Sequence, residues 1–133
     1  MANKDLMELE LDITRPKATA RELTELRTLL LIEINQTMDV DSIEIGQPPE
    51  PRSPDAVVIG AIVVGLLPVV ADKLGDLLID WLKRHDECNI TLKVPLRNAA
   101  PLEITYDPRY TSEHDLKAWI DQARKLAKDA GEK

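Results

Sequence analysis

Residues 55–85 have the sequence DAVVIGAIVVGLLPVVADKLGDLLIDWLKRH, and this stretch decides how the chain folds. Its first part, Ala56–Ala71, contains no charged residue. Its second part alternates apolar and charged residues with the period of an α-helix, so that the apolar side chains share one face and the charged ones the other. We therefore predict one long helix over residues 56–85, strongly apolar in its first half and amphipathic in its second.

If the helical register continues backwards, the face that is charged in the second half becomes apolar in the first. That face consists of Val58, Ala61, Ile62, Gly65 and Val69. A transmembrane span is disfavoured, because the charge-free run would reach about 24 Å across a hydrocarbon layer of roughly 30 Å. The two remaining interpretations are a core helix covered by its own sheet, and a helix that docks a partner or a second copy. We favour the docking helix, although Pro68 would kink it.

The rest of the chain alternates strands and helices. Apolar and charged residues alternate from Met7 to Ile13, which predicts a strand with one wet face. We predict five further segments: a helix over 18–35, a short strand at 43–45, a proline-rich linker over 47–55, a β-hairpin over 88–107 and a helix over 111–130. The expected fold is a single α+β domain, residues 1–133. It has a small four-stranded sheet, a β-α-β-α-β-β-α element order, a βαβ half over 1–46, and three helices, of which the central one is long and apolar.

Composition limits the possible partners. The chain has 133 residues, 44% of them hydrophobic, and a formal net charge of −7. Because such a charge repels phosphate, we expect no nucleic-acid partner, and binding to anionic lipid is disfavoured. The single Cys88 fits a reducing compartment, and the beginning of the sequence carries charges where a signal peptide needs an apolar run, so we expect a cytoplasmic protein.

The residues that carry chemistry form no recognisable pattern. Gly60 and Gly65 have the spacing of a phosphate-binding loop, but leucines follow where lysine and serine or threonine are needed. His85, His114 and Cys88 lack the spacing of zinc ligands. A Cys88 nucleophile served by His85 is conceivable, yet no motif orients the pair. We therefore expect no catalytic residue, no cofactor and no bound metal, and no enzymatic activity.

Residues 48–94, PPEPRSPDAVVIGAIVVGLLPVVADKLGDLLIDWLKRHDECNITLKV, with the strand and helix before them and the hairpin and helix after them, resemble the effector-associated constant component family of bacteria. The shared plan is a proline-rich linker, a small-residue apolar helix with a DWLKR-like end, and a β-hairpin. The resemblance implies a non-enzymatic component of prokaryotic conflict or antiviral systems, encoded beside variable effectors and coupling them to a sensing or activating partner. It implies no catalytic residues.

The expected function is therefore a protein-interaction adaptor whose partner is an effector encoded nearby, a second copy, or both. The expected interface is the face of Val58, Ala61, Ile62, Gly65 and Val69. On this interpretation, Ile62→Asp should abolish assembly and leave the monomer folded. The alternative is a membrane-active subunit that docks on the membrane or forms a pore by inserting residues 56–71.

Overall fold

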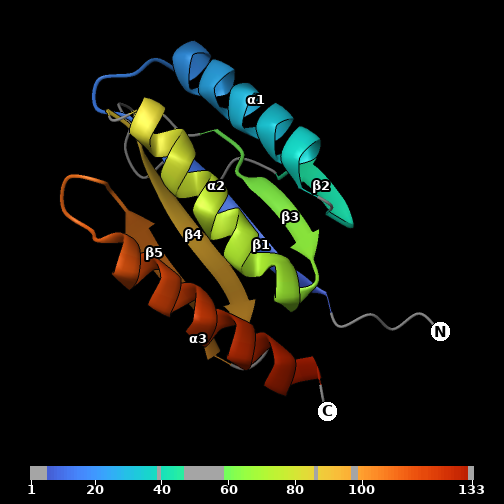
Figure 1. Cartoon of the computed structure of the whole chain (residues 1–133). Helices are drawn as coiled ribbons and strands as arrows, with labels where there is room; N and C mark the ends of the chain where they lie inside the picture. The colour runs from blue at the N-terminus through green and yellow to red at the C-terminus, as the bar shows by residue number, and fades with distance from the viewer. Residues whose placement is uncertain (1–5, 39, 47–58, 86, 97–98, 132–133) are drawn as a thin grey trace.

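The computed structural model describes residues 6–38, 40–46, 59–85, 87–96 and 99–131 (Figure 1). Five strands and three α-helices follow one another in the order β1 (Met7–Thr14), α1 (Ala20–Thr37), β2 (Ser42–Ile45), β3 (Ile62–Leu66), η1 (Pro68–Val70), α2 (Ala71–Arg84), β4 (Asn89–Leu96), β5 (Ala99–Tyr106) and α3 (Glu113–Gly131), where η1 is a 3-10 turn. The predicted α+β class is confirmed. The predicted linker over 47–55 lies outside the described residues.

The strands form one antiparallel sheet in the order β2-β3-β1-β4-β5. β1 lies in the middle, where it pairs with β3 on one side and with β4 on the other. The predicted hairpin is confirmed as β4 and β5, which pair from Ile90 opposite Tyr106 to Val94 opposite Leu102. Pro95, which cannot donate to a ladder, lies at an irregularity in this pairing, one residue from the end of β4.

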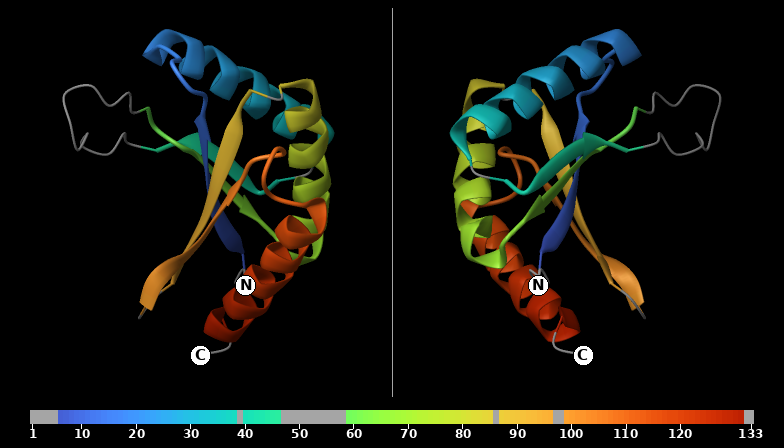
Figure 2. Two further views of the ribbon diagram at one scale, coloured as in Figure 1. Left: turned by 90° about the vertical axis from the view of Figure 1, so that its left-hand side faces the viewer. Right: turned by 90° about the vertical axis from the view of Figure 1, so that its right-hand side faces the viewer.

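The helices all pack against one face of the sheet (Figure 2). Met7, Leu9, Leu11 and Ile13 of β1 point towards them and are at most 2% exposed. α2 supplies the centre of the core, since Leu74, Leu78, Trp81 and Leu82 are also almost completely buried. The core contains no phenylalanine, so it is filled largely by aliphatic side chains together with two tryptophans.

The α2 helix is held on both flanks by ion pairs. On one side Asp72 pairs with Arg124 at 3.1 Å, Asp76 with Lys117 at 2.8 Å, and Lys83 with Glu113 at 3.5 Å, all from α3. On the other side Arg84 pairs with Glu33 of α1 at 2.5 Å. The charged face predicted for this part of the sequence is therefore largely directed at the neighbouring helices.

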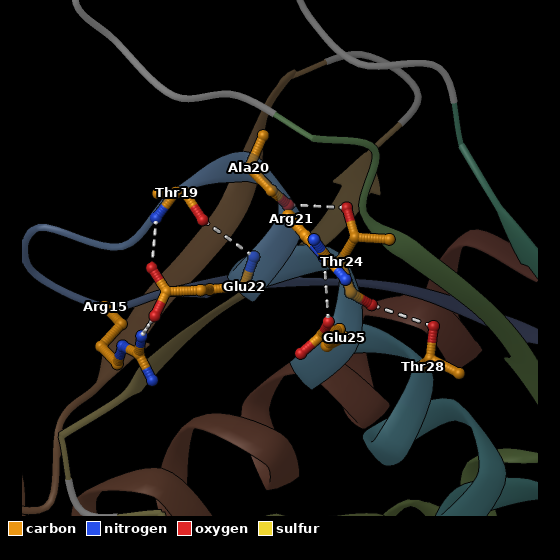
Figure 3. A network of polar contacts seen from close by, with 8 residues as sticks. All are labelled: Arg15, Thr19, Ala20, Arg21, Glu22, Thr24, Glu25 and Thr28. Atoms are coloured by element: carbon orange, nitrogen blue, oxygen red, sulfur yellow. Dashed lines mark hydrogen bonds and ion pairs between the residues drawn. The ribbon is translucent and has the colours of Figure 1, made fainter.

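A capping box starts α1 where the sequence predicts it (Figure 3). The Glu22 amide donates to the Thr19 hydroxyl at 3.1 Å, and the Thr19 amide donates to the Glu22 carboxylate at 2.9 Å. Two amides that the first helical turn leaves without intrahelical partners are thereby satisfied. Arg15 adds a third contact to the same carboxylate, at 2.5 Å.

The prediction of one helix over residues 56–85 is wrong. Ile62–Leu66 form the strand β3, and the α-helix starts only at Ala71. The sheet consequently has five strands where four were expected. Ile62, Val63 and Val64 are β-branched and fit a pleated, buried position, and a short apolar run of this kind has no periodicity that separates strand from helix.

Pro68 explains where the change of structure falls. It is the first residue of η1, and the amide of Val70 donates to the carbonyl of Leu67 at 3.0 Å. Proline is favoured at the first position of a helical turn, because that amide has no intrahelical partner. The residue that was expected to kink a long helix therefore begins the short turn that leads into α2.

Candidate interaction surfaces

The five residues predicted to form one helix face do not lie together on a helix. Ile62 is 0% exposed and points into the core, and Gly65 is buried in β3 opposite Ser42. Ala61 is half-buried just before β3, on the face of the sheet that points away from the helices. Val69 is 73% exposed in η1, and Val58 lies outside the described residues. The prediction that these residues form one docking face of a helix is thus wrong. Of the four that the structure describes, only Val69 is largely exposed.

Val69 belongs to an apolar surface at the junction of β3 and α2, which we call the turn surface and define as Val40, Leu67, Val69 and Val70. Leu67 is 38% exposed beside Val69, whereas Val40 and Val70 are half-buried. A hollow of about 220 Å³ lies between Val40, Asp41, Leu67 and Val70. A second one, of about 460 Å³, lies between Val70, Lys73 and the end of α1. The turn surface therefore combines a protruding valine with adjacent depressions.

A second surface is the face of the sheet opposite the helices, which we call the open face. Figure 2 shows the described helices on the other side, while the β2–β3 and β4–β5 pairs diverge on either side of β1. The side chains that strand pairing places on the open face include Glu8, Glu10 and Asp12 of β1, Glu44 of β2, Val63 of β3, Thr91 and Lys93 of β4, and Glu103 and Thr105 of β5.

One row of this face crosses all five strands in register. Glu44 lies opposite Val63, Val63 opposite Glu10, Glu10 opposite Lys93, and Lys93 opposite Glu103. Directly opposed side chains on neighbouring strands lie close enough to interact. The row therefore places one ammonium group between two carboxylates, with a third carboxylate beyond Val63. No ion pair within 4.0 Å joins Lys93 to another described residue.

The centre of the open face contains a hollow of about 180 Å³. Its lining combines carboxylates with apolar and neutral side chains: Glu10, Asp12, Ile59, Ala61, Thr91, Lys93 and Glu103. These residues come from β1, β4, β5 and the segment that leads into β3. An apolar wall beside several carboxylates suits a long side chain with an aliphatic stem and a cationic head.

Asp12 is a carboxylate of the hollow whose ionisation is affected by its surroundings. Partial burial raises the pKa of Asp12 above the ordinary value of 3.8; the Lys93 ammonium lowers that pKa, and the Glu10 and Glu103 carboxylates raise it. The net rise shows that desolvation and like charges outweigh the single lysine. The open face therefore has more negative charge than its own residues neutralise.

The pair considered for nucleophilic chemistry lies at the end of α2. The Cys88 amide donates to the His85 carbonyl at 3.0 Å, and both residues border a hollow of about 170 Å³. The His85 ring stacks on Trp81 with centroids 4.1 Å apart, and its Nδ1 lies 3.0 Å from the Trp81 carbonyl oxygen. Cys88 is only 2% exposed. The His85 ring is therefore held against α2 and the Cys88 thiol is buried, an arrangement typical of residues with a structural role.

Within the described ranges no group of three or more His, Cys, Asp or Glu side chains is arranged to hold a metal ion. In the same part of the chain, no helix has the length and apolar character needed to cross a membrane. The pore alternative depended on a helix over 56–71, and within that range residues 62–66 are a strand of the sheet.

The sequence contained the signal for the open face only in part. The alternation of Glu8, Glu10 and Asp12 with apolar residues predicts the wet face of β1, and Lys93 and Glu103 alternate in the same way in the hairpin. The pairing of β1 with β4 and of β4 with β5 gathers these charges, and the sequence alone does not show that β1 lies beside the hairpin. Of the four residues of the turn surface, the sequence-based interface included only Val69.

The fold and its surfaces define a small α+β protein with helices on one face of an antiparallel sheet. Comparison with known proteins finds no matching family, no matching curated protein and no matching solved structure.

Proposed function

We propose that this chain is a non-enzymatic protein-interaction adaptor that binds a partner protein through the turn surface. The observation that carries this proposal is the exposure of Val69. Its side chain is 73% exposed, and the nearby Leu67 is 38% exposed. An exposed valine costs little by itself, but a protruding apolar side chain flanked by depressions offers area that a complementary partner can bury. Burial contributes about 25 cal/mol per Å² of apolar surface, before the costs of association are subtracted.

The resemblance to the effector-associated constant component family supplies the kind of partner. On that basis the adaptor acts in a prokaryotic defence system, in the cytoplasm, and couples an effector encoded nearby to a sensing or activating protein. Two properties of the turn surface support a role in binding a partner. It lies at the junction of two elements, away from the centre of the core, and its residues Val69 and Leu67 stay exposed in the folded monomer.

The test uses the purified full chain and the purified products of the genes encoded beside it. In isothermal titration calorimetry, we expect the wild-type chain to bind one of these proteins and Val69→Asp to weaken that binding at least tenfold. Leu29→Asp is the matched control, because Leu29 is 51% exposed on α1 and lies outside the turn surface. Circular dichroism establishes that both variants fold.

Three outcomes contradict the proposal. They are equal loss of binding in both variants, no loss in Val69→Asp, and no binding of any neighbouring gene product by the wild-type chain. Self-association that is sensitive to Val69→Asp, observed by sedimentation without any heterologous binding, would assign the turn surface to a second copy and would also contradict the adaptor role.

A further inference from the structure

We infer that the open face binds a basic segment of a partner protein, and that an arginine or lysine of that segment enters the hollow between Glu10, Asp12 and Glu103. This surface is separate from the turn surface, so the inference goes beyond the proposed function and does not depend on it. The two surfaces together would let one small chain hold two partners at once.

Charge complementarity identifies the occupant. Among the residues that the structure describes, the paired strands place Glu8, Glu10, Asp12, Glu44 and Glu103 on the open face against Lys93, a formal charge of −4 from five carboxylates and one ammonium group. Other acidic side chains of the described chain, such as Asp72, Asp76 and Glu33, are already paired with basic groups of neighbouring helices. Those on the open face lie together on one side of the sheet, where they can meet a cationic partner, while a polyanion such as nucleic acid would be repelled.

The lining of the hollow favours a side chain over a bare ion. Ile59 and Ala61 form an apolar wall on the β3 side, and the carboxylates stand across from them on β1 and β5. The aliphatic stem of an arginine or lysine can pack on such a wall while its head reaches the carboxylates. Lys93 in the same lining opposes a compact cation at the centre, but its flexible stem allows its head to move away from an incoming guanidinium group.

The shape of the sheet favours a polypeptide segment over a small polyamine. The row from Glu44 to Glu103 spans all five strands, so a ligand that meets every carboxylate has to extend across the sheet. Neighbouring strands are separated by about 4.8 Å, which places the ends of the row roughly 19 Å apart. A chain with several basic residues can cover that distance and bury Val63, which lies between Glu44 and Glu10 in the row.

The experiment titrates the isotope-labelled full chain with a synthetic peptide of alternating arginine and serine, and follows backbone amide signals by NMR. A peptide of alternating glutamate and serine and the polyamine spermine are the comparison ligands. We expect the arginine peptide to shift the signals of Glu10, Asp12, Thr91, Lys93 and Glu103, and to bind at least tenfold more tightly than spermine. We expect no shift from the glutamate peptide.

Two matched double variants separate the open face from general acidity. Glu10→Gln/Glu103→Gln should weaken the arginine peptide about tenfold, whereas Glu25→Gln/Glu87→Gln should change binding less than about twofold. Both pairs remove the same charge, but Glu25 is exposed on α1 and Glu87 is exposed in the turn between α2 and β4. Lys93→Gln should tighten binding several-fold, because it removes the one like charge.

Each remaining outcome would overturn the inference. These are equal weakening by both double variants, weaker binding in Lys93→Gln, equal affinity for spermine, signal shifts confined to the helices, and no binding of the arginine peptide at low salt. The amide spectrum of each variant, recorded without ligand, shows whether it keeps the wild-type fold, so that a loss of binding is not mistaken for unfolding.

Discussion

Gly65 in β3 lies opposite Ser42 in β2, and the Ser42 hydroxyl occupies the space into which a Cβ at position 65 would project. The Asp41 amide also donates to the Gly65 carbonyl, at 2.9 Å. This glycine therefore permits close packing inside the monomer. It does not lie on a docking face of a helix, where the sequence-based register placed it.

Gly65→Val should consequently destabilise the monomer by about 1–3 kcal/mol, because the new side chain crowds Ser42. Urea unfolding followed by circular dichroism measures the change. Adding Ser42→Gly should recover part of the loss, since it removes the atom nearest to the new Cβ. Wild-type stability in the single variant would show that β2 does not pack against β3 as described.

Ile62 and Val63 are neighbours in β3 that face opposite sides of the sheet. Ile62 is 0% exposed, whereas Val63 is half-buried on the open face. Ile62→Thr should cost about 2–3 kcal/mol, because it removes buried methylene area and buries a hydroxyl, and Val63→Thr should cost less than about 1 kcal/mol. Thermal and urea unfolding compare the two.

This pair replaces the sequence-based expectation for Ile62→Asp. A carboxylate at a fully buried position has to lose its hydration, so that variant should unfold the monomer and leave no folded chain in which assembly could be tested. Equal costs for Ile62→Thr and Val63→Thr would contradict the assignment of the two faces.

The capping box at the start of α1 makes stability depend on pH. The hydrogen bond from the Thr19 amide, reinforced by the Thr19 hydroxyl and Arg15, holds the pKa of Glu22 below its ordinary value of 4.5. Because the pKa is lower in the folded chain, this contribution is fully present above pH 4.5 and is lost as the pH falls through the lowered pKa.

Thr19→Ala should therefore lower the free energy of unfolding by about 1 kcal/mol at neutral pH. Thr19→Ala should also make stability fall less steeply with acidification, because Glu22 then contributes less to the pH dependence of the free energy of unfolding. Urea unfolding at a series of pH values measures both effects. Thr24→Ala is the control, since the Thr24 hydroxyl donates to the Ala20 carbonyl inside α1, at 2.8 Å, and does not lie at the helix end. An equal effect of the two alanines would contradict the capping role.

The contribution of Asp12 to stability should depend on pH in the opposite sense to that of Glu22. Burial raises its pKa above 3.8 in the folded chain, so the folded state binds the proton more tightly than the unfolded state does. The contribution to stability is then greatest below pH 3.8 and is lost as the pH rises through the raised pKa. Asp12→Asn should consequently be more stable than the wild type at neutral pH.

An NMR titration of side-chain carboxyl carbons tests this directly. The pKa of Asp12 should lie above 3.8 in the wild type and rise further in Lys93→Gln, because the lysine lowers it. Asp107 is the internal reference, since its hydrogen bond with the Arg109 side chain holds its pKa below 3.8. An Asp12 that titrates below Asp107 would refute the description of the hollow.

Parts of this fold were predictable because their periodicity is unambiguous. The alternation of Met7 to Ile13 and the helical spacing of Leu74, Leu78 and Trp81 each fit one type of element. Residues 62–66 have no such signal, because Val63 and Gly65, which pair with Glu10 and Glu8 on the open face, are as free of charge as their core-facing neighbours. The candidate interface depended on the helix prediction. Because that prediction is wrong, Ile62 and Gly65, which were expected on a surface, are buried inside the monomer.

The open face could not have been assembled from the sequence for a related reason. Glu10, Lys93 and Glu103 are far apart in the chain, and their proximity depends on two separate strand pairings. Local patterns predict that each side chain faces water, but only the position of β4 between β1 and β5 places them in one row.

The central claim is that β3 is a strand of the sheet, with its residues divided between the core and the open face. Backbone NMR chemical shifts across residues 59–85 test it most directly. The account predicts strand-type Cα and Cβ shifts with slow amide exchange at 62–66, and helical shifts that start at about Ala71. Continuous helical shifts from Ile62 through Arg84 would contradict it.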